Sequence, residues 1–143
     1  LLESVPMDNP SWKPHEKSMN MKTLAVHIVE IFAWPDFMMN TDYLDFAKTP
    51  YKQPEIKTKA ELQKKLDEDY KKGAEALKKL TPEQLDGSWD IRQGEMVFQK
   101  WSKYGAIRHG FDQITHHRAQ LGVYYRLNDI LVPGSYGPSA DEK

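Results

Sequence analysis

The most constraining feature of this sequence is a long amphipathic run from about Lys103 to Asn128. Ser102 can cap its first turn, and the tail VPGSYGPSADEK brings the proline and glycine residues that commonly follow a helix end. At about 100° per residue, His117 lies at the centre of one face of this predicted helix. Within about 20° of it fall Ala106, Gly110, Tyr124 and Asn128. The opposite face carries Arg108, Thr115, Ala119 and Arg126. Such a helix has one face to bury, so we expect it to pack against further helices.

Two more helices are predicted before this run. Asn20 can cap a helix in MNMKTLAVHIVEIFAW, where apolar residues recur at helical spacing, and Pro35 falls where that helix should end or kink. Residues 42–57 contain two prolines and no periodicity, which indicates a long connection. The stretch 58–61, TKAE, is a capping box for the next helix. Its predicted buried stripe consists of Leu62, Leu66, Tyr70, Gly73, Leu77 and Leu80.

The fold class follows from these elements. Residues 81–84, TPEQ, can cap a short turn, whereas GSWDIRQGEMVFQKW is ambiguous between extended and irregular structure, with strand pairing open. The chain begins at Leu1 without a methionine, and we expect the first helix to be truncated there. Three clear helices, this truncated one and a long crossover predict an all-α bundle, as a single domain over residues 1–143.

Composition excludes several classes of partner. The 143 residues are 39% hydrophobic, which is enough for one core, and 20 Lys and Arg face 21 Asp and Glu. This balanced charge gives no electrostatic reason to bind nucleic acid or an anionic membrane. The absence of cysteine excludes disulfides and thiolate metal sites and is compatible with a reducing cytoplasm. No apolar run approaches the roughly 18 to 20 residues of a membrane span, so we expect a soluble, cytoplasmic protein.

Two histidines on separate predicted helices face inward. His27 lies within about 60° of Leu24 on its helix, and His117 is central on the last one. Gln113 precedes His117 by one turn on the same face, the i, i+4 spacing at which two side chains can converge on one ion. The candidate metal site is therefore His27, Gln113 and His117. His116 lies about 100° from His117, at the boundary of the buried face.

The residue pattern leaves an alternative open at each histidine. A single inward histidine is more often a core residue satisfied by a hydrogen bond than a metal ligand. Several polar groups buried together shift the balance toward a shared ion, because each needs a partner in a low-dielectric interior. A ferritin-like di-metal centre is excluded, because no glutamate stands three residues before any of the inward histidines.

Two segments resemble the DinB/YfiT-like family of metal-dependent bundle proteins. WKPHEKSMNMKTLAVHI is similar to the family's W-x-P-x-x-x-S entry into a helix with the first histidine, and DQITHHRAQLGVYYRLNDILVPGSYGPSADE resembles its HHR(G/A)Q segment and tail. The resemblance implies a four-helix bundle with a long link between the second and third helices. It also implies a homodimer that binds zinc, nickel or a similar divalent ion.

The resemblance implies functional residues too. The family's first and last metal histidines fall on His27 and His117, and its middle histidine falls on Gln113, a neutral and weaker donor. The implied activity is thiol S-transfer with a low-molecular-weight thiol, or hydrolase-like or isomerase chemistry, on a small-molecule substrate. His116, Tyr136 or Glu30 could assist proton transfer. The alternative from another class is a non-catalytic bundle that binds a small molecule or only dimerises, with a weak or lost metal site.

Overall fold

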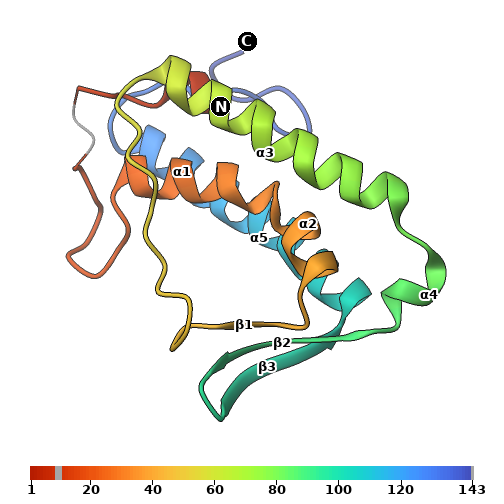
Figure 1. Cartoon of the computed structure of the whole chain (residues 1–143). Coiled ribbons are helices and arrows are strands. Elements are labelled where there is room, and N and C mark those ends of the chain that lie inside the picture. Colours follow the sequence, from red (N-terminus) through yellow and green to blue (C-terminus); the bar gives the residue numbers. More distant parts are fainter. Residues whose placement is uncertain (9–10, 143) are drawn as a thin grey trace.

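The computed structural model describes residues 1–8 and 11–142, and its helices form the greater part of the molecule (Figure 1). Helix α1 packs against both α3 and α5, and the sheet lies at the end of the molecule opposite both chain termini. The elements in chain order are the 3₁₀ turn η1 (Leu2–Ser4), α1 (Met21–Ile31), α2 (Trp34–Asn40), β1 (Tyr43–Asp45), α3 (Lys59–Lys79), α4 (Pro82–Leu85), β2 (Ser88–Gln93), β3 (Met96–Ser102) and α5 (Lys103–Arg126).

Helix α1 begins at the predicted cap but ends before Pro35, where the sequence predicted its end or a kink. The Asn20 side chain accepts a hydrogen bond from the Thr23 backbone N–H at 2.7 Å, which satisfies one free donor of the first turn. The helix stops at Ile31, and α2 starts at Trp34 with Pro35 in its first turn, where a missing N–H costs nothing. The proline therefore marks a new helix, displaced from the first.

Helix α5 has the predicted buried face. His117 is buried, and so are Ala106, Gly110 and Tyr124, which share its face, whereas the residues predicted to lie opposite are exposed. Ser102 caps the helix by accepting a hydrogen bond from the Gly105 N–H at 3.1 Å.

The predicted stripe on α3 is wrong in part. The capping box of Thr58 and Glu61 forms, but Tyr70 is 60% exposed and Leu77 is exposed as well. A Cβ added at Gly73 would lie 2.0 Å from the backbone oxygen of Phe32, so the helix backbone itself touches the α1–α2 junction there. This close approach buries Gly73, and the flanking apolar residues stay at the rim of the contact.

The all-α class is not confirmed, because residues 43–45, 88–93 and 96–102 form a small sheet beside the helices. Strand β1 pairs parallel to β2, with Tyr43 opposite Asp90, and β2 pairs antiparallel to β3 across a turn in which Gly94 has φ +61°. The chain is therefore mostly helical with a three-stranded sheet. Its first element is a single 3₁₀ turn, so a four-helix bundle is not confirmed.

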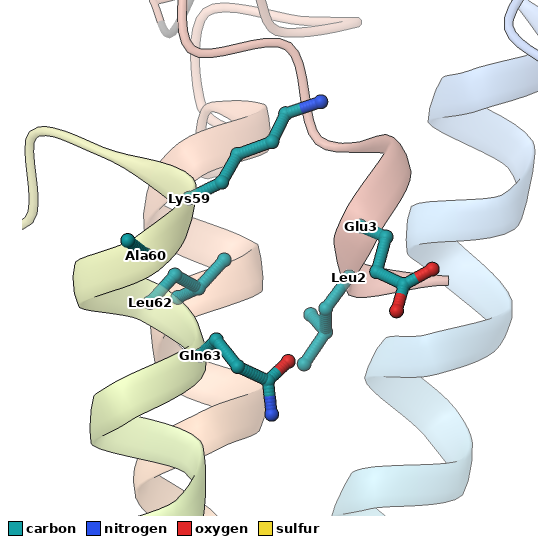
Figure 2. Close-up of a pocket in the computed structure, with 6 residues that line it drawn as sticks. All are labelled: Leu2, Glu3, Lys59, Ala60, Leu62 and Gln63. Atoms are coloured by element: carbon teal, nitrogen blue, oxygen red, sulfur yellow. The ribbon is translucent and has the colours of Figure 1, made fainter.

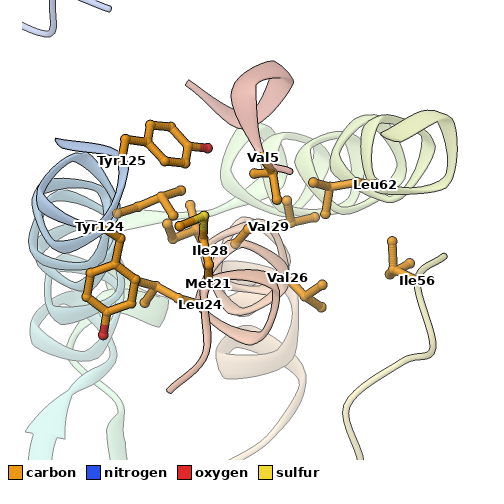
Figure 3. Close-up of a cluster of buried hydrophobic side chains, with 12 residues drawn as sticks. Val5, Met21, Leu24, Val26, Ile28, Val29, Ile56, Leu62, Tyr124 and Tyr125 are labelled. Carbon is orange, nitrogen blue, oxygen red and sulfur yellow. The ribbon is translucent and has the colours of Figure 1, made fainter. Parts of the chain in front are cut away.

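Two clusters of buried side chains hold the fold together. The larger lies between α1, α3 and α5 and includes Leu121 and Tyr125 of α5. Figure 3 shows residues of α1 between Tyr125 and Leu62 of α3. The smaller joins α2, the sheet and the start of α5, around Trp89 and Met38. Because these clusters occupy opposite ends of α5, the stretch of helix between them is free to carry polar side chains. In the described part of the chain no helix is both long and apolar enough to cross a bilayer.

Candidate functional site

His27 of α1 and His117 of α5 lie against each other in the middle of the helical layer. Their ring centroids are 4.8 Å apart and the rings meet edge-on at 71°. His117 is only 7% exposed, and His27 is half-buried. The structure thus brings together the two histidines that the sequence placed on inward faces of separate helices.

A hydrogen bond sets the orientation of the His117 ring. Its Nδ1 lies 2.8 Å from Oε1 of Gln120, three residues along the same helix. An amide oxygen can only accept, so the Nδ1–H donates, and in the neutral ring Nε2 then carries the lone pair. That is the tautomer in which Nε2 can bind a metal ion while the other nitrogen is held by a neighbouring side chain.

The surroundings keep His27 neutral. Burial lowers the pKa of its imidazole below the ordinary value, and the nearby His117 lowers it further. A neutral imidazole can accept a hydrogen bond or ligate an ion, whereas the protonated ring can do neither. His27 is therefore able to accept a hydrogen bond or to ligate an ion at neutral pH.

The third candidate ligand is weaker. Gln113 lies on α5 one turn before His117 and is half-buried. Within residues 1–8 and 11–142 no three His, Cys, Asp or Glu side chains gather as a group that could hold a metal ion. The same residues leave no buried side-chain nitrogen or oxygen without a hydrogen-bond partner. Imidazole nitrogens and an amide oxygen are chemically suitable ligands for a divalent ion. They bind it more weakly than three histidines would, because the amide oxygen is the poorer donor.

A cavity of about 500 Å³ adjoins His27. Its walls come from α1, α2, the sheet, the 42–57 connection and His109 of α5. The apolar lining residues are Met19, Trp34, Phe37, Met38, Leu44, Phe46, Trp89 and Ile91. The polar ones are Thr23, His27, Glu30, Thr49, Tyr51, Gln53 and His109. This volume and lining suit a small organic molecule with a mainly apolar body.

The long connection closes one side of the cavity through two hydrogen bonds to α1. The Tyr51 hydroxyl donates to Oε2 of Glu30 at 2.5 Å, and the Gln53 side-chain amide donates to the backbone oxygen of Thr23 at 2.9 Å. Burial raises the pKa of the Glu30 carboxyl above its usual range, and the Tyr51 hydrogen bond works against this rise. Burial also raises the pKa of the Tyr51 hydroxyl, with the bond to Glu30 adding to it.

His109 is a cavity residue that sequence reasoning missed. It stacks on Trp101 of β3 with ring centroids 4.9 Å apart, and it lines the same cavity as His27. At about 100° per residue, His109 falls about 80° from His117 on α5, at the boundary of the buried face. In the sequence, only its position two turns before His117 pointed to a role for His109. Its place in the cavity wall depends on the stacking against Trp101, which the sheet provides.

The three residues suggested for proton transfer have different environments. Glu30 lines the cavity. His116 is exposed and meets His117 edge-on at 4.9 Å, outside the cavity lining. Tyr136 is 85% exposed and its ring lies under the Arg118 guanidinium at 4.8 Å. Glu30 is therefore the one of the three that a molecule in the cavity would meet.

A second hollow, of about 270 Å³, lies between η1 and the start of α3 (Figure 2). Its lining consists of Leu2, Glu3, Lys59, Ala60, Leu62 and Gln63. It carries no histidine and no aromatic ring, so we place the candidate site at the cavity beside His27.

Comparison with known proteins agrees with the fold. The sequence model of the DinB family matches residues 1–142. The crystal structure of a DinB-like protein, YjoA from Bacillus subtilis, superimposes with a TM-score of 0.65 at 20% sequence identity, over 99% of this chain and 87% of that one. Identity this low shows a shared fold alone. No curated protein matches the sequence.

Proposed function

This chain belongs to the DinB family, and on that premise we propose two ligands for it. One is a divalent metal ion between α1 and α5, and the other is a small molecule in the adjoining cavity. The observation that carries the proposal is the contact of His27 with His117 at the edge of that cavity. The ion would be zinc or nickel, for which imidazole is a preferred ligand.

The chain contributes the following parts to such a site. His27 and His117 offer imidazole nitrogens, and the Gln113 amide oxygen offers a weaker third position. Gln120 holds the His117 ring by its Nδ1–H, and Trp34 packs edge-on against His27 with centroids 5.8 Å apart. A bound divalent ion supplies Lewis-acid activation of a water or of a low-molecular-weight thiol, as in a hydrolase or a thiol S-transferase.

Glu30 adds a group able to take a proton inside the cavity. Burial raises the pKa of its carboxyl, which makes Glu30 a stronger base than an exposed glutamate. The apolar walls exclude water from a substrate and so strengthen each polar contact made there.

A second candidate function is non-catalytic binding of a small molecule. Two observations favour it: Gln120 satisfies His117 without any ion, and Gln113 stands where the family has a histidine. The cavity would then be the functional feature, and the histidine pair a hydrogen-bonded part of its wall.

Elemental analysis and calorimetry with zinc and nickel separate the two candidates. We expect untagged protein to bind one ion and His117→Ala to lose that binding while its circular dichroism stays that of a folded protein, because a ligand is removed. His15→Ala, in an exposed loop, is the control and should bind as the wild type does. If His117→Ala keeps full occupancy, the site is misassigned. If the wild type takes up no ion, the non-catalytic function stands.

A further inference from the structure

Among its described residues, the cavity lining contains one carboxylate but no lysine or arginine. That carboxylate belongs to Glu30. Apart from its two histidines, the described lining therefore offers one charged side chain, and that charge is negative.

Glu30 has no ion-pair partner in the described part of the chain. One oxygen, Oε2, accepts the Tyr51 hydrogen bond, and a neutral hydroxyl does not cancel the charge. Lys65 of α3 acts on Glu30 from a distance, but its ammonium is 2.8 Å from Asp69, which balances it. A half-buried carboxylate without its own cation would be stabilised by a cationic ligand.

The cavity that Glu30 lines also has aromatic walls. Trp34, Phe37 and Trp89 line the cavity, with Phe37 and Trp89 packed edge-on at 6.2 Å between centroids. The faces of such rings attract organic cations, and a carboxylate among aromatic rings is a common arrangement for ammonium recognition. A neutral apolar ligand would use the rings and leave the carboxylate uncompensated.

We propose that the cavity binds an organic ammonium ion with an apolar body, placing the ammonium beside Glu30 and the body against Trp34, Phe37 and Trp89. This rests on the proposed function only in taking the cavity as a small-molecule site, and it requires no metal ion. The Glu30 carboxylate would supply the charge, and the aromatic rings the selectivity for an apolar cation over a hydrated inorganic one.

The test compares two molecules of the same shape. Benzyltrimethylammonium and its neutral isostere neopentylbenzene are measured by equilibrium dialysis against the full chain, with a chelator present so that no metal contributes. We expect the cation to bind at least ~10-fold more tightly than the neutral molecule. This is the gain in affinity expected when a cation contacts both aromatic rings and a carboxylate away from water. Glu30→Gln keeps the shape and an acceptor for Tyr51, and it should remove most of this preference while neopentylbenzene binds as before.

Two further variants make the result interpretable. Glu68→Gln removes the same charge from an exposed position on α3 outside the cavity and should leave the preference intact. Phe37→Leu keeps an apolar side chain at a partly exposed position and removes one ring, so it should weaken the cation alone by about 2- to 5-fold, even if Glu30→Gln does not fold.

The proposal is overturned if the neutral isostere binds as tightly as the cation, if folded Glu30→Gln keeps the preference, or if neither probe binds at millimolar concentration. His117→Ala separates this outcome from that of the metal site. It should keep the cation preference in the presence of chelator, so metal binding and ammonium binding can fail independently.

Discussion

At the scale of single residues, Gln113 is the weakest ligand of the proposed metal site. The amide oxygen of glutamine is neutral and a poorer ligand for zinc or nickel than an imidazole nitrogen. His27 and His117 are in contact, so two of the proposed ligands already lie side by side. The strength of the proposed site therefore depends on the residue one turn before His117.

Gln113→His should raise zinc or nickel affinity by ~10-fold or more. Substitutions of residues that only hydrogen-bond to a metal ligand already change metal affinity by about this factor. It adds an imidazole on the face of α5 that carries His117. The gain should shrink as pH falls through about 6.5, because a protonated imidazole cannot ligate. Calorimetry at pH 8 and pH 6 measures both effects, with Gln63→His on the exposed side of α3 as the control. Unchanged affinity at pH 8 in a folded variant would mean that any ion binds elsewhere.

At the scale of elements, Asp45 joins the 42–57 connection to the hairpin. It is buried, and its Oδ1 accepts hydrogen bonds from the backbone N–H of Gly94 and of Ala47, each at 2.9 Å. The bond to Gly94 lowers the pKa of the Asp45 carboxyl most, and the bond to Ala47 lowers it further. Since β1 has three residues, this side chain is a large part of what keeps the strand beside β2.

This arrangement predicts a pH dependence of stability. Because the folded pKa of Asp45 is depressed, its contribution is present above the ordinary pKa of 3.8 and is lost as pH falls through the folded value. Asp45→Asn should lower the urea midpoint at pH 6, and the difference from the wild type should shrink at pH 3. Asp112→Asn, on the exposed face of α5, should leave the midpoint nearly unchanged at both pH values. An equal difference at pH 6 and pH 3 would show that the carboxylate charge does not hold β1.

At the scale of the whole molecule, the proposed homodimer depends on the outer face of α5. Thr115 and Ala119 are exposed there, as a helix contact between two copies requires. Gly122, the third small residue of that face, is half-buried, and Val132 of the C-terminal tail lies 3.7 Å from where its Cβ would be. The tail therefore covers one end of the face and leaves the other open.

We expect light scattering at micromolar concentration to give about twice the chain mass of 16.6 kDa. Ala119→Arg should reduce it to one chain, because the longer, charged side chain would separate the two helices. Val97→Arg, on the exposed hairpin strand β3, is the matched control and should remain dimeric. A single-chain mass for the wild type rules out the dimer, and a single-chain mass for the Val97 variant alone would move the contact to the hairpin.

Local patterns in the sequence predicted the elements whose structure depends on near neighbours. The buried face of α5 around His117, the Asn20 cap and the capping box at Thr58 each involve residues within a few turns of one another, so periodicity and capping rules describe them. The inward direction of His27 follows from the same rule. Sequence alone thus determined the main helices and the two histidines.

Tertiary structure decided what depends on distant partners. Strand β1 is too short for a pattern and forms against β2, and the close approach of Gly73 to Phe32 joins two separate helices. The cavity carboxylate Glu30 has its hydrogen-bond partner 21 residues away in an aperiodic connection. Contacts at such separations depend on how complete elements pack, and a local pattern carries no information about that packing. For this reason the histidine pair could be predicted from the sequence, while the walls and charge of the cavity beside it could not.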